Sequence, residues 1–187
     1  FITQEAYAKR ILRKFNMLEA TPVGTPTLNV QDPEDSVTKQ RITENMPYRT
    51  AVGSLMYLAT GTRPDLAHAV SIVSQKLDNA TIEDWNKVKR IFRYLNGTVE
   101  LGILYKHNGT KTIEAFSDAD YAQDVSTRRS TSGTVCKFAD GAVSWLSQKQ
   151  KCVALSTTEA ELIAANEAAK DVIWLRRLYH DLMNFSD

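Results

Sequence analysis

Apolar residues recur at helical spacing in four segments of the first half of the chain. These segments are residues 4–15, residues 48–60, a stretch opened by Pro64, and residues 81–96. One face of the last segment carries Trp85, Val88, Phe92 and Leu95 at helical intervals. Thr81 and Asp84 have the spacing of a capping box at its start, and Gly97 stands where the helix should end. Residues 19–47, which hold four prolines and Gly24, are predicted to form a long loop.

From residue 99 the period changes to the alternation typical of β-strands. Strands are predicted in three segments, residues 99–107, 111–122 and 132–149. The last segment is divided at residues 139–142, where an Asp-Gly pair predicts a tight hairpin turn. A long helix is predicted over residues 156–182, because Ser156 and Glu159 have capping-box spacing at its start. The second half is therefore expected to consist of strands followed by one helix.

Composition adds limits to this picture. The 187 residues are 43% apolar and 24% charged, which is ordinary for a globular protein with a buried core. The net charge of +1 excludes a strongly basic or acidic tail, and no apolar run is long enough to cross a membrane. Cys136 and Cys152 are too few for a disulfide framework, and the chain lacks zinc-ligand spacing. We expect an intracellular protein and, because the sequence opens on FITQEAYAKR without methionine, a segment of a longer one.

Charge is distributed unevenly between the two halves. Residues 1–106 hold 14 basic and 11 acidic residues, whereas residues 107–187 hold 9 and 11. Nucleic acid would favour the first half, and a divalent cation the second. The face of the 81–96 helix opposite the apolar stripe carries Lys87, Arg90, Arg93 and the aromatic Tyr94. This face is a candidate for contacts with a phosphate backbone, and a merely solvated helix face is the alternative.

Carboxylates gather at two places in the second half. Asp118 and Asp120 fall on one face at the end of the predicted strand 111–122, where a cation could bind. Glu159 and Glu161 open the long helix but point to different faces because they are two residues apart. We expect Glu159 to cap the helix and Glu161 to point inward towards the sheet. A buried Glu161 would need a metal ion or a hydrogen-bonding partner such as nearby backbone.

Four segments of the chain resemble the Pol polyprotein of copia-type LTR retrotransposons. They are YRTAVGSLMYLATGTRPDLAHAVSIVSQ, WNKVKRIFRYLNGT, FSDADYAQDVSTRRSTSG and AVSWLSQKQKCVALSTTEAELIAANEAAKDVIWLRRL. The resemblance implies an α+β chain in two parts. Residues 1–106 would be the helical thumb and connection region of a reverse transcriptase. Residues 107–187 would be a truncated ribonuclease H-like α/β domain, a three-stranded antiparallel meander plus a long helix.

The resemblance also implies roles for individual residues. Asp118 and Glu161 match the first-strand aspartate and first-helix glutamate of the ribonuclease H motif, which are catalytic ligands of Mg²⁺ or Mn²⁺. Asp120 is a candidate further metal ligand, and Asp124 a partial substitute for one. In that chemistry two metal ions activate water for cleavage of the RNA strand in an RNA–DNA hybrid. The turn STRRSTSG offers candidate contacts to the hybrid backbone, namely Arg128, Arg129, Ser130 and Ser132; an exposed hairpin without ligand is the alternative.

The family pattern is incomplete in this sequence. Its third acid lies on a strand after the long helix, and its polymerase aspartates precede the region that matches residue 1. We therefore expect no polymerase activity and impaired or absent nuclease activity; the alternative is an inactive remnant that binds nucleic acid or protein. Expected partners are an RNA–DNA hybrid or other nucleic acid, the rest of the polyprotein, and a second copy paired through the open edge of the strand around residues 113–118. Coverage of that edge by the N-terminal helices is the alternative. A cytoplasmic particle or the nucleus is the expected location.

Overall fold

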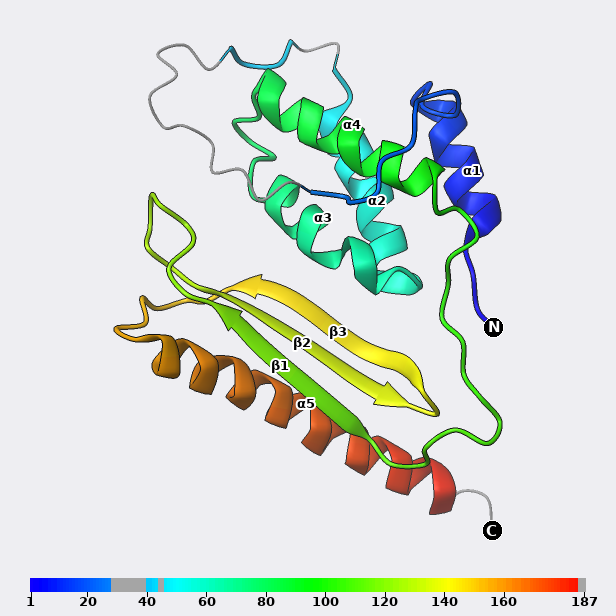
Figure 1. Cartoon of the computed structure of the whole chain (residues 1–187), viewed down its shortest axis with the longest axis vertical. Helices are drawn as coiled ribbons and strands as arrows, with labels where there is room; N and C mark the ends of the chain where they lie inside the picture. The colour runs from blue at the N-terminus through cyan, green and yellow to red at the C-terminus, as the bar shows by residue number, and fades with distance from the viewer. Residues whose placement is uncertain (28–39, 44–45, 185–187) are drawn as a thin grey trace. The chain divides into compact units, whose positions relative to one another are not determined.

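The computed structural model describes residues 1–27, 40–43 and 46–184, and it divides the chain into two compact units. The N-terminal unit is Ile2–Gly102; the C-terminal unit is Ile103–Asp187 together with Phe1. The boundary predicted from the sequence, between residues 106 and 107, lies slightly later in the chain. Helices come first, followed by a three-stranded antiparallel sheet and a long helix, so the chain is of mixed α+β type (Figure 1).

The N-terminal unit is built from helices around one apolar core. Its elements are α1 (Glu5–Lys14), α2 (Tyr48–Gly61), the 3-10 helix η1 (Pro64–Leu66), α3 (Ala67–Ser74) and α4 (Ile82–Asn96). All four helical segments predicted from the sequence are therefore confirmed. Each helix buries one stripe, and the stripes meet in a core that includes Leu12, Leu55, Leu58, Leu66, Val88 and Phe92. Within the described residues, no helix is both long and apolar enough to span a membrane.

The start and end of α4 follow the sequence signals. The Asp84 backbone N–H donates to the Thr81 hydroxyl at 3.3 Å, and the Thr81 N–H donates to the Asp84 carboxylate at 2.9 Å. This reciprocal pair is a capping box, which satisfies backbone donors that the first helical turn leaves free. Gly97 follows the last helical residue, as predicted.

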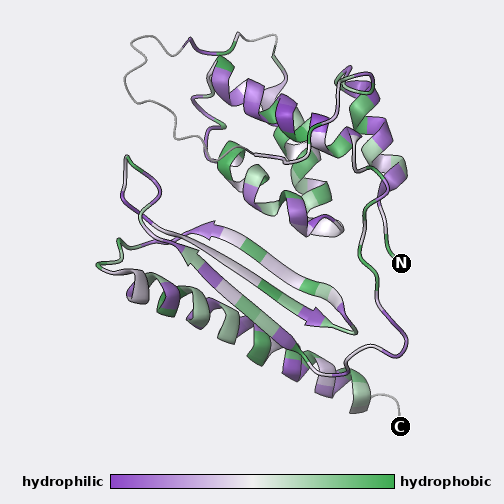
Figure 2. Cartoon of the chain, viewed as in Figure 1, coloured by the Kyte–Doolittle hydropathy of each residue, from purple (hydrophilic) through white to green (hydrophobic). Residues whose placement is uncertain are grey.

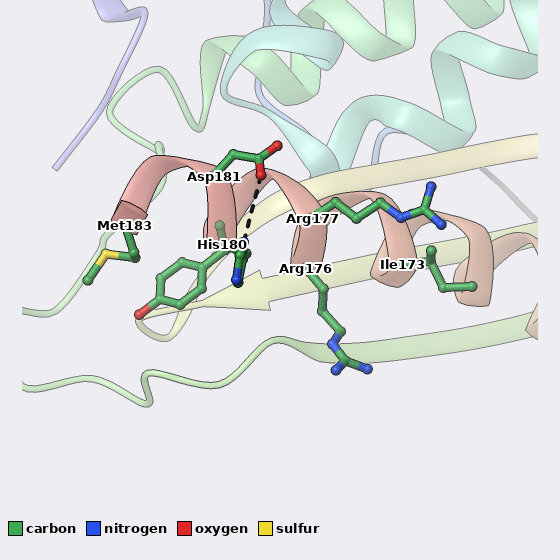
Figure 3. A pocket seen from close by; sticks show the side chains of 7 residues that line it. Ile173, Arg176, Arg177, His180, Asp181 and Met183 are labelled. Atoms are coloured by element: carbon green, nitrogen blue, oxygen red, sulfur yellow. Dashed lines mark ion pairs between the residues drawn. The ribbon is translucent and has the colours of Figure 1, made fainter. Parts of the chain in front are cut away.

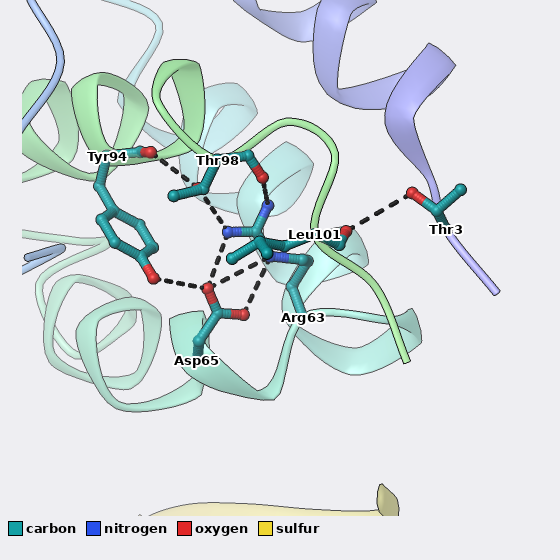
Figure 4. A network of polar contacts seen from close by, with 6 residues as sticks. All are labelled: Thr3, Arg63, Asp65, Tyr94, Thr98 and Leu101. Carbon is teal, nitrogen blue, oxygen red and sulfur yellow. Dashed lines mark hydrogen bonds and ion pairs between the residues drawn. The ribbon is translucent and has the colours of Figure 1, made fainter. Parts of the chain in front are cut away.

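A buried arginine joins the turn before η1 to the end of α4 (Figure 4). Arg63 is 2% exposed, and its guanidinium donates to both carboxylate oxygens of Asp65 at 2.7 and 2.9 Å. It also donates to the carbonyl and the hydroxyl of Thr98, and the Tyr94 hydroxyl donates to Asp65 at 3.0 Å. Burial first, and then the neighbouring Asp65 carboxylate, raise the pKa of Tyr94. The Arg63 guanidinium is thus ion-paired with Asp65 and hydrogen-bonded to Thr98.

The C-terminal unit contains three strands and one helix. They are β1 (Glu114–Asp120), β2 (Thr131–Phe138), β3 (Gly141–Lys149) and α5 (Thr157–Asn184), and the sheet order is β1-β2-β3. Both strand pairs are antiparallel. The expected strand over residues 99–107 is wrong. Only the end of that segment contacts the β2–β3 turn: the Lys106 backbone N–H donates to the Ala139 carbonyl, and the Tyr105 hydroxyl donates to the Ala142 carbonyl.

The β2–β3 hairpin turns on two non-glycine residues. Ala139 and Asp140 both have positive φ, 51° and 63°, which is the pattern of the tight hairpin turn that matches strand twist. The hairpin lies within residues 139–142 as predicted, but its two turn residues are Ala139 and Asp140; the predicted Asp-Gly pair is wrong, because Gly141 already begins β3. The Asp140 carboxylate forms an ion pair with the Lys106 ammonium at 3.0 Å. This contact from outside the hairpin stabilises the left-handed backbone conformation of Asp140. Gly141 is needed for space, because a Cβ there would stand 2.5 Å from the Tyr105 ring.

The register shows which sheet face α5 covers. The Ser144 hydroxyl on β3 hydrogen-bonds Asp171 of α5 at 3.0 Å, and Ser144 lies opposite Cys136 of β2 and, through it, Ala115 of β1. Because side chains alternate along each strand, every second residue counted from Ala115, Cys136 or Ser144 faces α5, and the residues between them face away. On the helix, the sheet-facing stripe is Ala160, Ala164 and Ala168, all buried. Apolar and polar residues mix along both the sheet and α5 (Figure 2).

We expect Arg63→Met to destabilise the chain strongly, by about 3–5 kcal/mol, because it leaves the Asp65 carboxylate without its partner in a partly buried site. Arg49→Met is the matched control. Arg49 also pairs with an aspartate, Asp78, but both side chains are exposed, so its loss should change the free energy of unfolding by less than about 1 kcal/mol. Urea unfolding of the two variants measures the difference; equal effects would contradict the role given to burial.

Candidate functional site

Asp118 lies on the sheet face that α5 does not cover. It pairs with Gly133 of β2, and its neighbours Ser117 and Ala119 lie opposite Thr134 and Ser132, which face the helix. Because side chains alternate along a strand, Asp118 points to the opposite face, where it is exposed. Gly133 opposite has no side chain, so nothing from β2 covers the carboxylate. The Asp118 carboxylate is therefore open to solvent and ligands.

The two glutamates at the start of α5 have different roles. The Glu159 carboxylate accepts the Leu155 N–H at 2.6 Å, and the Glu159 N–H donates to the Ser156 hydroxyl at 3.1 Å. The prediction that Glu159 caps the helix is confirmed. The prediction that Glu161 points inward is wrong, because Glu161 is exposed. The buried stripe of alanines at every fourth residue takes the inward position, and Glu161 lies at its edge.

The acidic residues do not form a metal centre by themselves. Asp120 faces the same side of the sheet as Asp118, but one of its oxygens accepts the Thr131 N–H at 2.8 Å across the strand pair. Over residues 1–27, 40–43 and 46–184, no group of three or more Asp, Glu, His or Cys side chains is placed to hold a metal ion. The predicted ligands Asp118, Asp120 and Glu161 are therefore present but do not make a complete site.

Asp124 organises the loop between β1 and β2. Its carboxylate accepts the N–H groups of Ser126 and Thr127 and pairs with Lys149 of β3. Burial opposes ionisation, but the hydrogen bonds from Lys149, Ser126 and Thr127 outweigh it and hold the pKa of Asp124 below its usual range. Arg128, at φ 55°, closes the loop with a backbone hydrogen bond to the Asp124 carbonyl.

The loop exposes two of the four residues predicted to contact nucleic acid. Arg128 and Arg129 are exposed. Ser130 is 0% exposed, and its hydroxyl accepts the Ala122 N–H at 3.0 Å, so its predicted contact to a nucleic acid is wrong. Ser132 is also buried and accepts from the Gln150 side chain at 2.9 Å. Both serines stabilise the base of the loop, because they satisfy polar groups that burial would otherwise leave unpaired.

The basic face of α4 is largely engaged within its own unit. Arg90 donates to the Thr25 hydroxyl at 2.9 Å, and Arg93 donates to the Thr21 carbonyl at 2.7 Å. These contacts hold the 21–25 segment against the helix, and both side chains are only partly exposed. Lys87 lies 3.8 Å from Asp84. The predicted exposed aromatic, Tyr94, is instead half-buried on Asp65. Nucleic-acid contacts by Lys87, Arg90 and Arg93 remain a prediction.

Sequence reasoning missed two polar residues that shape the C-terminal unit. Gln150 is buried and its amide donates to both the Ser132 hydroxyl and the Ala160 carbonyl, so it joins the sheet to the first turn of α5. Lys149 pairs with Asp124 across 25 positions of sequence. A long-range pair of this kind leaves no periodic signal in the sequence, since only the sheet register brings its members together.

Comparison with known proteins assigns the chain to a family. It is 45% identical to the retrovirus-related Pol polyprotein from transposon TNT 1-94 of Nicotiana tabacum, over 97% of this chain. It is 38% identical to that from transposon RE2 of Arabidopsis thaliana, again over 97% of this chain. It is also 47% identical to secreted RxLR effector protein 161 of Plasmopara viticola, over 71% of this chain and 93% of the effector. The chain belongs to the Pol polyprotein family of copia-type retrotransposons.

This Pol segment spans only 14% and 12% of the length of the TNT 1-94 and RE2 polyproteins. No family model matches it. No solved structure matches it either. The family is thus established by sequence similarity to one part of these polyproteins, and the activity of the full polyproteins is a separate question for this segment.

We expect Asp124→Asn to lower the free energy of unfolding of the Pol segment at pH 7 by about 1–2 kcal/mol, because it removes charge-assisted hydrogen bonds in a partly buried site. The folded-state pKa of Asp124 is depressed, so its contribution is present above the unfolded value near 4 and is lost as pH falls through the folded value. The difference from wild type should therefore shrink below about pH 4.

Urea unfolding at pH 7 and at successively lower pH measures this effect. Asp78→Asn, at a highly exposed carboxylate, is the control and should show almost no difference at any pH. A difference between wild type and Asp124→Asn that stays constant down to pH 2 would contradict the assignment.

Proposed function

We propose that the C-terminal unit is the first part of a ribonuclease H-like domain that binds an RNA–DNA hybrid on the sheet face left open by α5. The observation that carries the proposal is the exposed Asp118 in β1, the first strand of an antiparallel meander that leads into a helix presenting Glu161. Membership in a Pol family supports it. In this proposal Asp118 supplies one carboxylate of a metal-dependent nuclease site. Glu161 is not assigned to that site, because it lies on α5, which covers the other face of the sheet.

The donor set argues that this segment does not cleave a hybrid alone. Magnesium prefers carboxylate oxygens, and cleavage by two metal ions needs several of them at one place. The described residues offer no group of three acidic, histidine or cysteine side chains, and one Asp120 oxygen is engaged by β2. We therefore assign binding, and not turnover, to the segment by itself.

Arg128 and Arg129 supply the phosphate contacts in this proposal. Their loop joins the end of β1, which carries Asp118 and Asp120, to the start of β2. Both side chains are exposed, while Asp124 and the buried Ser130 fix the backbone beneath them. An ordered loop loses less conformational freedom when its arginines bind phosphate, so the contacts cost less entropy. The arginines of α4 contribute less, because they already hold the 21–25 segment.

The test measures binding of a fluorescent RNA–DNA hybrid by anisotropy over a range of salt concentrations. Arg128→Ala/Arg129→Ala should weaken binding and reduce the slope of log affinity against log salt by about 2, since each lost phosphate contact removes about one. Arg10→Ala/Arg13→Ala, on exposed positions of α1, is the matched control and should leave the slope nearly unchanged. An unchanged slope in the loop variant would refute the role of the loop.

Incubation of the same hybrid with Mg²⁺ or Mn²⁺ tests the second part of the proposal. We expect no cleavage by the wild-type segment and equal binding by wild type and Asp118→Asn. Cleavage that Asp118→Asn abolishes would show that the segment completes a nuclease site, and would overturn the assignment of binding without turnover.

A protein-interaction role is the second candidate function. The match covers 93% of the length of the Plasmopara viticola relative, which is named a secreted effector. A protein little longer than the matched region therefore exists by itself. Absence of any salt-dependent binding to the hybrid or to single strands would favour this role over the nucleic-acid role.

A further inference from the structure

The outer face of α5 is uncovered by its own unit. The sheet packs on the stripe of Ala160, Ala164 and Ala168, and the opposite side of the helix is exposed. This outer face consists of Leu162, Ala165, Ala169, Ile173 and Arg176, at intervals of three or four residues. Leu162 is 65% and Ile173 51% exposed, which is unusual for large apolar side chains on a helix whose other face already packs on a sheet.

A hollow lies on the C-terminal half of this face (Figure 3). It is lined by Ile173, Arg176, Arg177, Tyr179, His180, Asp181 and Met183. Four of these residues stand at positions i, i+3, i+4 and i+7, namely Ile173, Arg176, Arg177 and His180. Four residues at this spacing form the hole that receives a side chain from a facing helix in knobs-into-holes packing. The hole offers Ile173 and the aliphatic stems of the two arginines to an apolar side chain of another helix.

The knob that fits this hole is present on the same helix. Leu162 lies about three turns before the hole on the same face, so it cannot enter the hole of its own helix. In a second copy running antiparallel and centred at Ala169, Leu162 comes opposite the hole. Ala169 then faces Ala169 of the second copy, and its small side chain lets the two helices approach closely.

Charge along the outer face favours the same arrangement. Glu161 near the start of α5 and Arg176 near its end lie only about 60° apart around the helix axis, so they flank the same side of the face. In an antiparallel pair centred at Ala169, Glu161 of each copy lies on the same flank as Arg176 of the other and within one residue of its level along the axis. In a parallel pair, Glu161 of one copy and Arg176 of the other would stand about 22 Å apart along the helix axis, so this ion pair could not form.

We propose that the outer face of α5 docks against the same face of a second copy of this chain, with the two helices antiparallel. The contact is isologous: Leu162 of each copy fills the hole of the other, and two Glu161–Arg176 ion pairs flank the centre. The pairing encloses the exposed leucine and isoleucine, which supplies the driving force, and the ion pairs set the direction.

The free edge of β1 is a poorer surface for self-association than α5. The strand EAFSDAD carries three carboxylates and no basic residue. Antiparallel pairing of two β1 strands centred at Ser117 would place Glu114 opposite Asp120 on both sides of the centre, and like charges directly opposite each other destabilise a sheet. The acidic edge therefore disfavours the strand-to-strand dimer expected from the sequence.

Sedimentation equilibrium of the whole chain over a wide concentration range tests the proposal. We expect a monomer–dimer equilibrium that Ala169→Glu weakens at least tenfold, because it places two carboxylates at the centre of the contact. Ala6→Glu, the same change at an exposed position of α1, is the control and should leave the equilibrium unchanged. A monomer at all concentrations, or a dimer that Ala169→Glu leaves intact, overturns the proposal.

Charge reversal tests the direction of the helices. Glu161→Arg should weaken the dimer several-fold, and the double variant Glu161→Arg/Arg176→Glu should restore it, because the ion pairs re-form with opposite sign. Circular dichroism confirms that each variant keeps its helix content. A double variant weaker than either single variant, with folding intact, excludes the antiparallel arrangement and overturns the proposal.

Discussion

A single helix covers one face of the three-stranded sheet, and the rest of the C-terminal unit depends on this constraint. The alanine stripe of α5 is narrow, so the helix lies close to β1 and β2 and buries small side chains against Ser132, Thr134 and Cys136. Because side chains alternate, half of the residues of each strand are left on the uncovered face. Asp118 is one of them. The exposure of its carboxylate and that of the outer face of α5 have the same origin.

The same constraint separates Glu161 from Asp118. Glu161 lies at the edge of the sheet-facing stripe, on the boundary between the side of α5 that packs on the sheet and the side that is exposed. Asp118 lies on the other face of the sheet, so the two carboxylates that the resemblance implies as joint metal ligands do not share a face. In the proposed helix pair Glu161 would instead contact an arginine of a second copy.

Polar groups, and not only apolar ones, hold the elements of each unit together. In the N-terminal unit the buried Arg63 connects the turn before η1 to the residue that follows α4, through Asp65 and Thr98. In the C-terminal unit Gln150 joins β2 to α5, and Asp124 joins the β1–β2 loop to β3. Each of these groups is partly or fully buried and hydrogen-bonded, so each fixes one arrangement of its neighbours by making the alternatives costly.

Local pattern determined the helices, most of the sheet and the family of this chain. Helical periodicity located α1 to α4, the capping signals of Thr81 and Glu159 located the starts of α4 and α5, and alternation located β1 to β3, because these features depend on neighbours a few residues apart. The same reasoning failed for residues 99–107, whose alternation resembles that of a strand but whose backbone contacts the β2–β3 turn. Which face a residue occupies, and what covers it, was decided only by the tertiary structure. Ser130 and Tyr94 have the chemistry of ligand-binding residues in the sequence, yet distant segments bury them, and Glu161 is exposed because the alanines beside it pack more closely on the sheet.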